Sequence, residues 1–297
     1  MKVIIISVNQ IFLAIFLIVC TPYVLFSQEE ADTIRIKHPG LFFGIHLGPI
    51  QTHLVNEGSL SVSDLVSEKQ NSFGGGLEIG YFFSNYIGLS SGISFVSCKT
   101  QLTLNSYQNK FNTLDTENEP YERQVSGTNI QELQKVGFLS VPVCLNIRLP
   151  LNNAIGFILQ PGINLSVPVN KSYTTSGTFT FKGYYPAYNA LLENLPAFGF
   201  PVNISSVSAG DLKIKSVNFN ALVSAGFDFF VQKKIQVAVM ACYSRSLLNN
   251  SAYSFPDKFQ LSSDVNQINS LMGGSNNVSV QSIGANITFR YFIKSHF

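Results

Sequence analysis

The amino-acid sequence predicts an all-β fold, an eight-stranded antiparallel up-and-down β-barrel that crosses a membrane with its strands. Three observations carry this prediction. Eight runs of residues alternate between apolar and polar positions with a period of two. The connections between these runs are alternately short and long. Charged residues supply only 12% of the chain, about half of what a typical soluble domain carries.

The run nearest the C-terminus shows the alternation most clearly. Its odd positions from Ile283 to Ile293 are apolar or aromatic, whereas its even positions from Ser282 to Arg290 are small, polar or charged. Phe297 ends the sequence in phase with the apolar positions. A strand of this kind presents one face to hydrocarbon and the other to a polar interior.

Residues 1–27 are interpreted as a secretory signal peptide. Lys2 precedes a strongly apolar run over residues 3–19, and Pro22 and the small residue Ser27 follow that run. A positive residue, an apolar run and a small residue before the cleavage site are the parts of such a signal. The expected divisions are a signal peptide over 1–27, a periplasmic N-terminal segment over 28–40 and an outer-membrane barrel over 41–297.

Two alternatives remain for residues 1–27. The apolar run over residues 3–19 approaches the length of a membrane-spanning helix, which would retain it as an anchor. Cys20 is a candidate for lipid modification. The bulky Val19 before it argues against this, because lipoprotein signals usually have a small residue at that position. The later sequence has no apolar run of about 18 residues, so a mature chain in a membrane must cross it with strands.

The connections divide into two classes. Three are hairpin turns of a few residues, and four are long and rich in Asn, Ser, Gly, Asp and Glu. Short periplasmic turns opposite long external loops are typical of outer-membrane barrels. The turns cover 85–86, 150–153 and 232–234, and the loops cover 55–72, 105–134, 175–212 and 249–277. The strands cover 41–54, 73–84, 87–104, 135–149, 154–174, 213–231, 235–248 and 278–293.

Alternation within the middle strands indicates an apolar outer face. In the second strand, Leu77 and Tyr81 share one parity, whereas Glu78 and several glycines share the other. In the sixth strand, Phe227 opposes Asp228 in the same way, and the fourth and fifth strands repeat the pattern. This arrangement is inverted relative to a water-soluble barrel, whose interior is apolar.

Glycine and proline have separate meanings in these strands. Many inward positions are glycine, which suits a barrel of eight strands because its interior has little room for side chains. The glycines at 74–76 are read as a flexible shoulder rather than a phosphate loop, because neither a helix nor a Lys-Ser/Thr pair follows them. Pro142, Pro161 and Pro168 predict bulges or frayed ladder ends, since proline lacks the backbone donor.

The third long loop, residues 175–212, contains a stretch over 188–195 that resembles a short helix between two prolines. Four aromatic residues flank it, and we expect them to bury themselves against the barrel mouth or against a partner. A self-packed lid and a partner-binding surface are the two interpretations of this loop. The flanking residues are Tyr184, Tyr185, Phe198 and Phe200.

The period of two places five ionisable residues on the inner face of the barrel. Opposite charges in a narrow lumen stabilise one another, so a salt-bridged plug near the short turns is favoured. The alternative is a polar conduit for small solutes, against which stands the filled interior of an eight-stranded barrel. The five residues are His46, Glu78, Arg148, Asp228 and Arg290.

The cysteines and histidines predict no cofactor or metal site. After the expected cleavage three cysteines remain, at 98, 144 and 242, and no Cys-x-x-Cys occurs. An odd, widely spaced set indicates neither a disulfide framework nor a zinc site. A bridge between Cys98 and Cys144 stays open as an alternative, because both fall on the inner face of neighbouring strands.

Catalysis has little support in the sequence. His53, near the end of the first strand, is the one plausible base, with Ser94, Ser244 or Ser246 as partners, and no short motif supports such a pair. We therefore predict no catalytic residues and keep an outer-membrane lipid-modifying enzyme as an alternative. A formal net charge of +2 gives no electrostatic reason to expect nucleic acid as a partner.

Over residues 40–297 the sequence resembles a family of outer-membrane β-barrel proteins common in Bacteroidota, porin-like and related to barrel proteins associated with secretion and gliding. The points of resemblance are the Leu-Phe-Ser-Gln cleavage site at 25–28, the opening strand around 43–48, the Gly-Leu-Glu-Ile-Gly-Tyr-Phe-Phe run at 76–83, and the Phe-Arg-Tyr-Phe ending at 289–292. The resemblance implies a location in the bacterial outer membrane and no catalytic residues.

Two non-enzymatic functions follow from this resemblance and from the loops. The first is a small plugged barrel whose external loops bind a partner or protect the surface. The second is an accessory component of a protein-secretion machine, docked through its loops or turns. The expected partners are outer-membrane lipids and, for the second function, other envelope or secretion proteins. The sequence does not define an oligomeric state.

Overall fold

The computed structural model describes residues 40–59, 65–152, 154–232, 234–253, 260–262 and 264–293. The expected signal peptide, its cleavage site and the alternatives for Cys20 lie outside these residues. So does the expected N-terminal segment up to residue 39. Side chains are described throughout these ranges except at 57–59 and 276.

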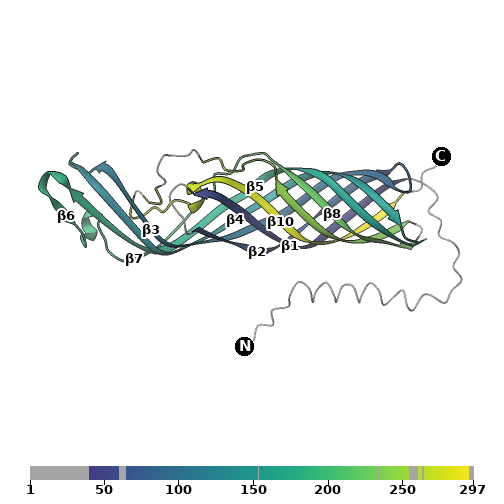
Figure 1. Ribbon diagram of the computed structural model, residues 1–297, viewed down its shortest axis with the longest axis horizontal. Helices are drawn as coiled ribbons and strands as arrows, with labels where there is room; N and C mark the ends of the chain where they lie inside the picture. The colour runs from purple at the N-terminus through teal and green to yellow at the C-terminus, as the bar shows by residue number, and fades with distance from the viewer. Residues whose placement is uncertain are drawn as a thin grey trace, which may run out of the picture. The chain divides into compact units, whose positions relative to one another are not determined.

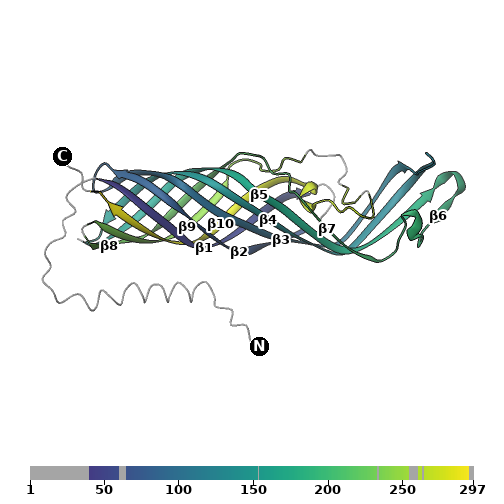
Figure 2. The ribbon, with the colours of Figure 1, turned by 180° about the vertical axis from the view of Figure 1, so that it is seen from behind.

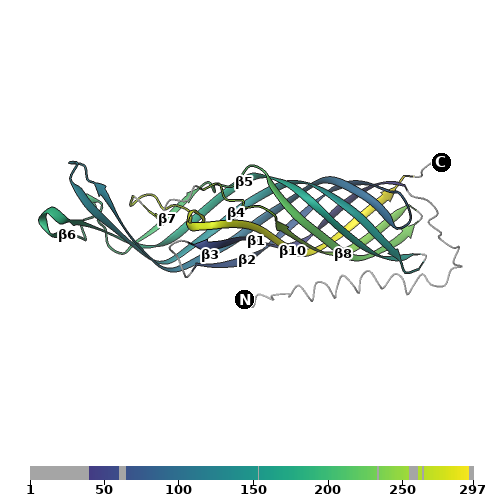
Figure 3. The same cartoon turned by 45° about the horizontal axis from the view of Figure 1, so that its top comes forward.

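Among the described residues, eight strands close into an antiparallel ring in the order β1–β2–β3–β4–β5–β8–β9–β10, and β10 pairs back onto β1 (Figures 1 and 3). The prediction of an eight-stranded antiparallel barrel is confirmed. The ring contains β1 (Leu41–Ser59), β2 (Leu65–Phe82), β3 (Ile87–Leu114), β4 (Pro120–Pro150), β5 (Ile155–Tyr185), β8 (Asn218–Gln232), β9 (Ile235–Ser246) and β10 (Ser275–Phe292).

The wall of the barrel is apolar outside and mostly polar inside, as the alternation predicts. The exceptions inside include a cluster of phenylalanine rings at the short-turn end, formed by Phe42, Phe82, Phe230 and Phe292. Leu77, Ile93 and Phe289 are each more than half exposed on the outer face. These residues belong to a continuous belt of exposed apolar side chains on all eight strands, which we call the apolar belt. A surface of this kind is stable against lipid, because water is absent there.

Inward glycines allow the strands to pack closely. A Cβ at Gly48 would overlap the backbone carbonyl of Ala285, and one at Gly226 would overlap that of Val239. Both oxygens belong to the neighbouring strand, where backbone cannot move aside without breaking the ladder. Glycine at these positions therefore sets how closely the strands of the wall approach one another.

The three prolines singled out in the sequence, Pro142, Pro161 and Pro168, lie where the ladder is interrupted on one side. On β4, Pro142 falls in a gap toward β3, whose register resumes unchanged after it. On β5, Pro161 falls in a similar gap toward β4, and Pro168 lies beside a register shift near Gly137. The sequence prediction of a bulge is therefore right for Pro168. Pro142 and Pro161 remove only local hydrogen bonds, because the strand on the other side of each proline, β5 for Pro142 and β8 for Pro161, pairs with it without a register shift.

The expected long loops are largely paired strands, which corrects the sequence interpretation. Most of the residues in 105–134 belong to β3 and β4, which pair with each other as far as Leu114 and Pro120. Much of 55–72 likewise belongs to β1 and β2. Outside the membrane these strands need no apolar outer face, so their Asn, Ser and Thr residues resemble a loop in sequence although most of them pair with a neighbouring strand.

The loop over 175–212 also differs from expectation. β5 continues to Tyr185, and two short strands, β6 (Ala190–Leu192) and β7 (Ile204–Gly210), then fold back and pair with it (Figure 2). This segment extends the sheet formed by β3, β4 and β5, and its last residue, Leu212, packs into a buried apolar cluster with Leu54 and Met272. We call the part of that sheet beyond Leu104 of β3 the extension.

The helix expected over 188–195 is not formed. Two single-turn 3₁₀ helices, η1 (Pro186–Tyr188) and η2 (Pro196–Phe198), lie beside β6 instead. Asn189 ends η1 with a positive φ angle, and Asn194 adopts another positive φ angle before η2 begins, so no helix can propagate between them. None of the described helices is long and apolar enough to span a membrane.

Candidate functional site

The first ion pair of the lumen joins β4 to β8 near the short turns. Arg148 Nε donates to Asp228 Oδ2 at 2.5 Å and Arg148 Nη2 donates to Asp228 Oδ1 at 3.0 Å, in a bidentate arrangement. Both side chains are buried, and the guanidinium carbon lies 5.1 Å from the centre of the Phe230 ring. Bidentate geometry and a cation–π contact suit an arginine withdrawn from water.

The second ion pair joins β10 to β2. Arg290 Nε donates to Glu78 Oε1 at 2.5 Å, and Arg290 Nη2 lies 3.4 Å from Glu78 Oε2. The Arg290 side chain is almost completely buried, with its guanidinium carbon 4.9 Å from the centre of the Phe42 ring. Each ion pair therefore links two strands that are not neighbours in the ring.

Two amide side chains connect the ion pairs into one network. Gln236 donates to Asp228 and accepts from Arg290 Nη1 at 3.3 Å. Asn146 Oδ1 lies 3.4 Å from Arg290 Nη2, and the Asn146 amide nitrogen donates to Ser90 at 2.9 Å. Four of the five ionisable residues placed inward by the sequence thus meet in this charge network. Gln236 and Asn146 were not predicted, because amides carry no charge signal in a sequence.

A cavity of about 140 Å³ lies above the charge network. His46, the fifth predicted residue, contributes to its wall together with Glu78, and serines supply much of the rest. Three polar atoms in this wall are buried without a protein partner: Asn164 Oδ1, Asn286 Oδ1 and Thr288 Oγ1. The wall of this cavity mixes apolar side chains such as Leu222 and Met240 with polar ones, and a water molecule beside the three atoms would satisfy them.

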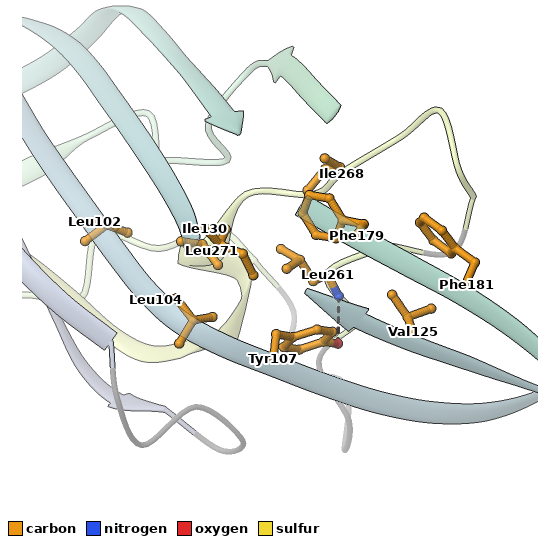
Figure 4. Close-up of a cluster of buried hydrophobic side chains, with 10 residues drawn as sticks. All are labelled: Leu102, Leu104, Tyr107, Val125, Ile130, Phe179, Phe181, Leu261, Ile268 and Leu271. Atoms are coloured by element: carbon orange, nitrogen blue, oxygen red, sulfur yellow. Dashed lines mark hydrogen bonds between the residues drawn. The ribbon is translucent and has the colours of Figure 1, made fainter. Parts of the chain in front are cut away.

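The opposite end of the barrel is covered by a segment between β9 and β10, which we call the lid and define as residues 260–262 and 264–274. Leu261, Ile268 and Leu271 of the lid pack into a buried apolar cluster with side chains of β3, β4 and β5 (Figure 4). The backbone amide of Leu261 donates to Tyr107 Oη at 3.0 Å. A second cluster contains Met272 of the lid. The lid is thus held by apolar burial.

Glu132 fastens the lid to the wall. This residue of β4 is fully buried, and its two carboxylate oxygens accept four hydrogen bonds. Ser270 Oγ donates at 2.8 Å and the Leu271 amide at 2.7 Å, both from the lid. All four donors are neutral groups, and burial raises the pKa of the carboxyl against the opposing effect of these donors.

Glu132 was missed by the sequence analysis because it falls in an expected loop. Its neighbours Leu133 and Lys135 are exposed, whereas Gln134 and Val136 are buried, so the period of two continues through this stretch. Extending that period beyond the apolar part of the strand would have placed Glu132 on the inner face.

The catalytic pair left open by the sequence is not formed. His53 pairs with Gln281 in the β1–β10 ladder, on the outer face of the wall, two positions beyond the outward Ile283. Ser94 and Ser244 line the internal cavity, and Ser246 donates to Asn220 inside the barrel at 2.8 Å. The wall therefore separates the histidine from all three serines.

The three described cysteines are free, so the Cys98–Cys144 alternative is wrong. Within the part of the chain that the structure describes, no group of three or more His, Cys, Asp or Glu side chains is arranged to hold a metal ion.

These features define an outer-membrane β-barrel protein, whose apolar belt meets lipid and whose polar groups lie inside. The chain belongs to the family of the outer membrane protein beta-barrel domain, whose model matches residues 26–253. The outer-membrane location expected from the sequence follows from this membership. No curated protein sequence matches the chain.

Solved structures of bacterial outer-membrane proteins are similar in fold. Ail, the attachment invasion locus protein of Yersinia pestis, is 12% identical, with a TM-score of 0.31 over 85% of this chain and 99% of that one. OprG of Pseudomonas aeruginosa is 12% identical, with a TM-score of 0.34 over 87% and 99%. Neisserial surface protein A is 10% identical, with a TM-score of 0.33 over 84% and 97%.

Proposed function

We propose that this protein is a closed, non-enzymatic barrel that presents its extension to a macromolecular partner outside the cell. The observation that carries the proposal is the difference in length around the ring. β4 and β5 each have 31 residues, whereas β8 has 15 and β9 has 12. A wall that only crosses the membrane needs strands of about 9–11 residues, so the extra length serves a purpose beyond the bilayer.

Closure of the lumen supports a role other than transport. The charge network occupies the short-turn end, and the lid with its apolar clusters occupies the other. The cavity between them is bounded on both sides by buried, hydrogen-bonded side chains. In a barrel of eight strands the side chains fill the interior, and the two closures leave no described route for a solute.

The end of the extension supports recognition of a partner. Phe198 is 73% exposed and Tyr188 is 64% exposed, in a part of the protein that lies beyond the apolar belt. Tyr188 Oη donates to Glu119 at 2.8 Å and the nearby Tyr185 Oη donates to Asp115 at 3.1 Å, which anchors this segment to the β3–β4 turn. The backbone amide of Phe198 donates to the Leu195 carbonyl at 3.0 Å. Exposed aromatic side chains on an ordered backbone suit a protein interface. We call the exposed apolar residues at this end the tip, namely Leu114, Tyr188, Leu191, Leu195 and Phe198.

Closure is tested by planar-bilayer recording with the purified protein. We expect no discrete conductance steps from the wild type. A variant that opens the lid, Glu132→Gln, should remain non-conducting, because the charge network still blocks the short-turn end. Regular wild-type steps would overturn the closed state and favour the polar conduit.

Recognition is tested by placing a photo-reactive amino acid at position 198 and irradiating intact cells. A matched control carries the same probe at Val207, which is 71% exposed on β7 of the same extension but lies outside the tip. Cross-links to a partner from position 198 and not from 207 are expected. Cross-links only from a probe at Tyr86, in a short turn, would instead favour the accessory secretion component.

A further inference from the structure

Two lysines face each other on the outer surface of the barrel. Lys99 of β3 and Lys135 of β4 are directly opposed in the antiparallel ladder, and both are exposed. Like charges in this position destabilise a sheet. Within the described ranges, neither ammonium group has a carboxylate within salt-bridge distance. The pairing is therefore unfavourable in the protein alone and becomes favourable when an anion lies between the two amines.

The lysine pair lies directly at the edge of the apolar belt. On β3 the next outward side chains toward the short turns are Ser97 and the exposed Phe95, and on β4 they are Gly137 and the exposed Leu139. The surface thus changes from cationic to apolar within two outward positions. This is the level at which lipid headgroups meet hydrocarbon around a membrane barrel.

Other cationic residues occupy the same rim. Lys69 of β2, Lys215 before β8 and Arg245 of β9 are exposed beyond the apolar belt at the long-strand end. Glu68, which pairs with Gln101, is an acid at this level. At the opposite rim the described cation is Lys234, whose amine lies 5.9 Å from the Tyr291 ring centre. Among the described residues, exposed positive charge is therefore more frequent at the rim that bears the extension.

We propose that Lys99 and Lys135 together bind a phosphate group of a lipid in the outer leaflet of the outer membrane. The two ammonium groups neutralise the phosphate, and Ser172, opposite Lys135 on β5, supplies a neutral donor beside it. The acyl chains of the same lipid lie along Phe95 and Leu139. A lipid is chosen over free phosphate because the apolar surface adjoins the lysine pair directly.

The test uses the full-length protein in mild detergent and native mass spectrometry with two probes, a bisphosphorylated lipid A and its dephosphorylated form. The wild type should retain the phosphorylated probe and lose the other. Because each lysine near an anionic lipid surface contributes about fivefold, the K99Q/K135Q double variant should bind roughly thirtyfold more weakly. A matched control is K110Q/K182Q, which removes two lysines of the extension that already pair with glutamates.

A second variant separates binding from folding. K135E places a carboxylate opposite Lys99, which replaces repulsion by a cross-strand ion pair, so its heat-modifiable migration should remain that of a folded barrel while lipid retention is lost. Equal retention of the two probes by the wild type would overturn the proposal. So would retention by the double variant at the control level, or full displacement of the lipid by millimolar inorganic phosphate. These outcomes leave the proposed recognition by the tip untouched.

Discussion

The interior of the barrel is held together by different chemistry at its two ends. At the short-turn end, two arginines and two carboxylates meet in a bidentate network with two amides, and both guanidinium groups lie over a cluster of buried phenylalanine rings. At the long-strand end, the lid is held by apolar clusters and by one carboxylate that accepts only neutral donors. The difference follows the surroundings. Within the bilayer the lipid outside the wall is apolar, so apolar side chains gain little by turning inward, and ion pairs and hydrogen bonds can hold the interior together. Beyond the bilayer the wall faces water, so burial of apolar side chains again stabilises the structure.

The largest effect is expected at the short-turn end. Arg290→Met would leave Glu78 buried without its partner, so the free energy of unfolding should fall by about 3–5 kcal/mol. Denaturant titration in vesicles, followed by heat-modifiable migration, measures this change. The double variant E78Q/R290M removes both charges and should be less destabilised than R290M alone. If both variants unfold alike, the ion pair does not organise this end.

The lid should respond more weakly and locally. Glu132→Gln places an NH2 group on one of the two carboxylate sites, and on either site one neighbour is a nitrogen that cannot accept, the Gln134 amide or the Leu271 backbone amide. A protonated carboxyl avoids this clash, because its single proton can point at the hydroxyl of Ser270 or Thr175. We expect docking of the lid to weaken by about 2 kcal/mol, with little change in global unfolding. Hydrogen exchange at the Leu271 amide measures it. Glu122→Gln, in a partly exposed pair with Lys110, is the control and should leave that amide protected.

Docking of the lid should depend on pH through Glu132. Burial raises the pKa of Glu132, so the protonated form is favoured when the lid is docked. The resulting contribution to the stability of the docked lid is complete below the ordinary glutamate pKa, and it is lost as pH rises through the raised pKa. Exchange at Leu271 should therefore become faster toward higher pH, after correction for intrinsic rates. E132Q should show no such trend. If the exchange rate at Leu271 depended on pH in the same way in the wild type and in E132Q, Glu132 would not be the group that makes docking depend on pH.

The smallest effect on stability is expected at the tip. Phe198→Ser should change the free energy of unfolding by less than about 0.5 kcal/mol, because the ring is mostly exposed. Phe200→Ser is the internal comparison: that ring is 3% exposed and lies against Tyr121, so roughly 3 kcal/mol should be lost. Limited proteolysis of the extension reports both changes. Equal losses would mean that the tip is part of the core rather than a free surface.

The period of two in the sequence was sufficient to predict the ring and to place Glu78, Arg148, Asp228 and Arg290 on its inner face. It could not predict which arginine meets which carboxylate. Those pairings depend on the stagger between strands, which neighbouring backbones set through contacts such as the one at Gly48. The sequence predicted inward charges, and which of them form ion pairs became clear only from the register of the strands.

The extension was not predicted because its strands lack the apolar outer face that marks the strands of the membrane wall. Strands in water need only one buried face, and in the extension that face includes Tyr107, Val125 and Phe179 at alternate positions among polar residues. The expected helix at 188–195 failed for a local reason, since Asn189 and Asn194 adopt a left-handed conformation that composition alone does not specify.

The ring is completed by the ladder that pairs Phe42 with Phe292, near the two extremes of the described chain. Until the last strand has been synthesised, the first strand has no partner on that side, and two unsatisfied backbone edges would face the bilayer. Assembly is therefore necessarily post-translational, and it belongs to the slow class governed by contacts distant in sequence. A chain stopped before β10 would be an insertion intermediate with an open seam, and a suitable substrate for capturing that state.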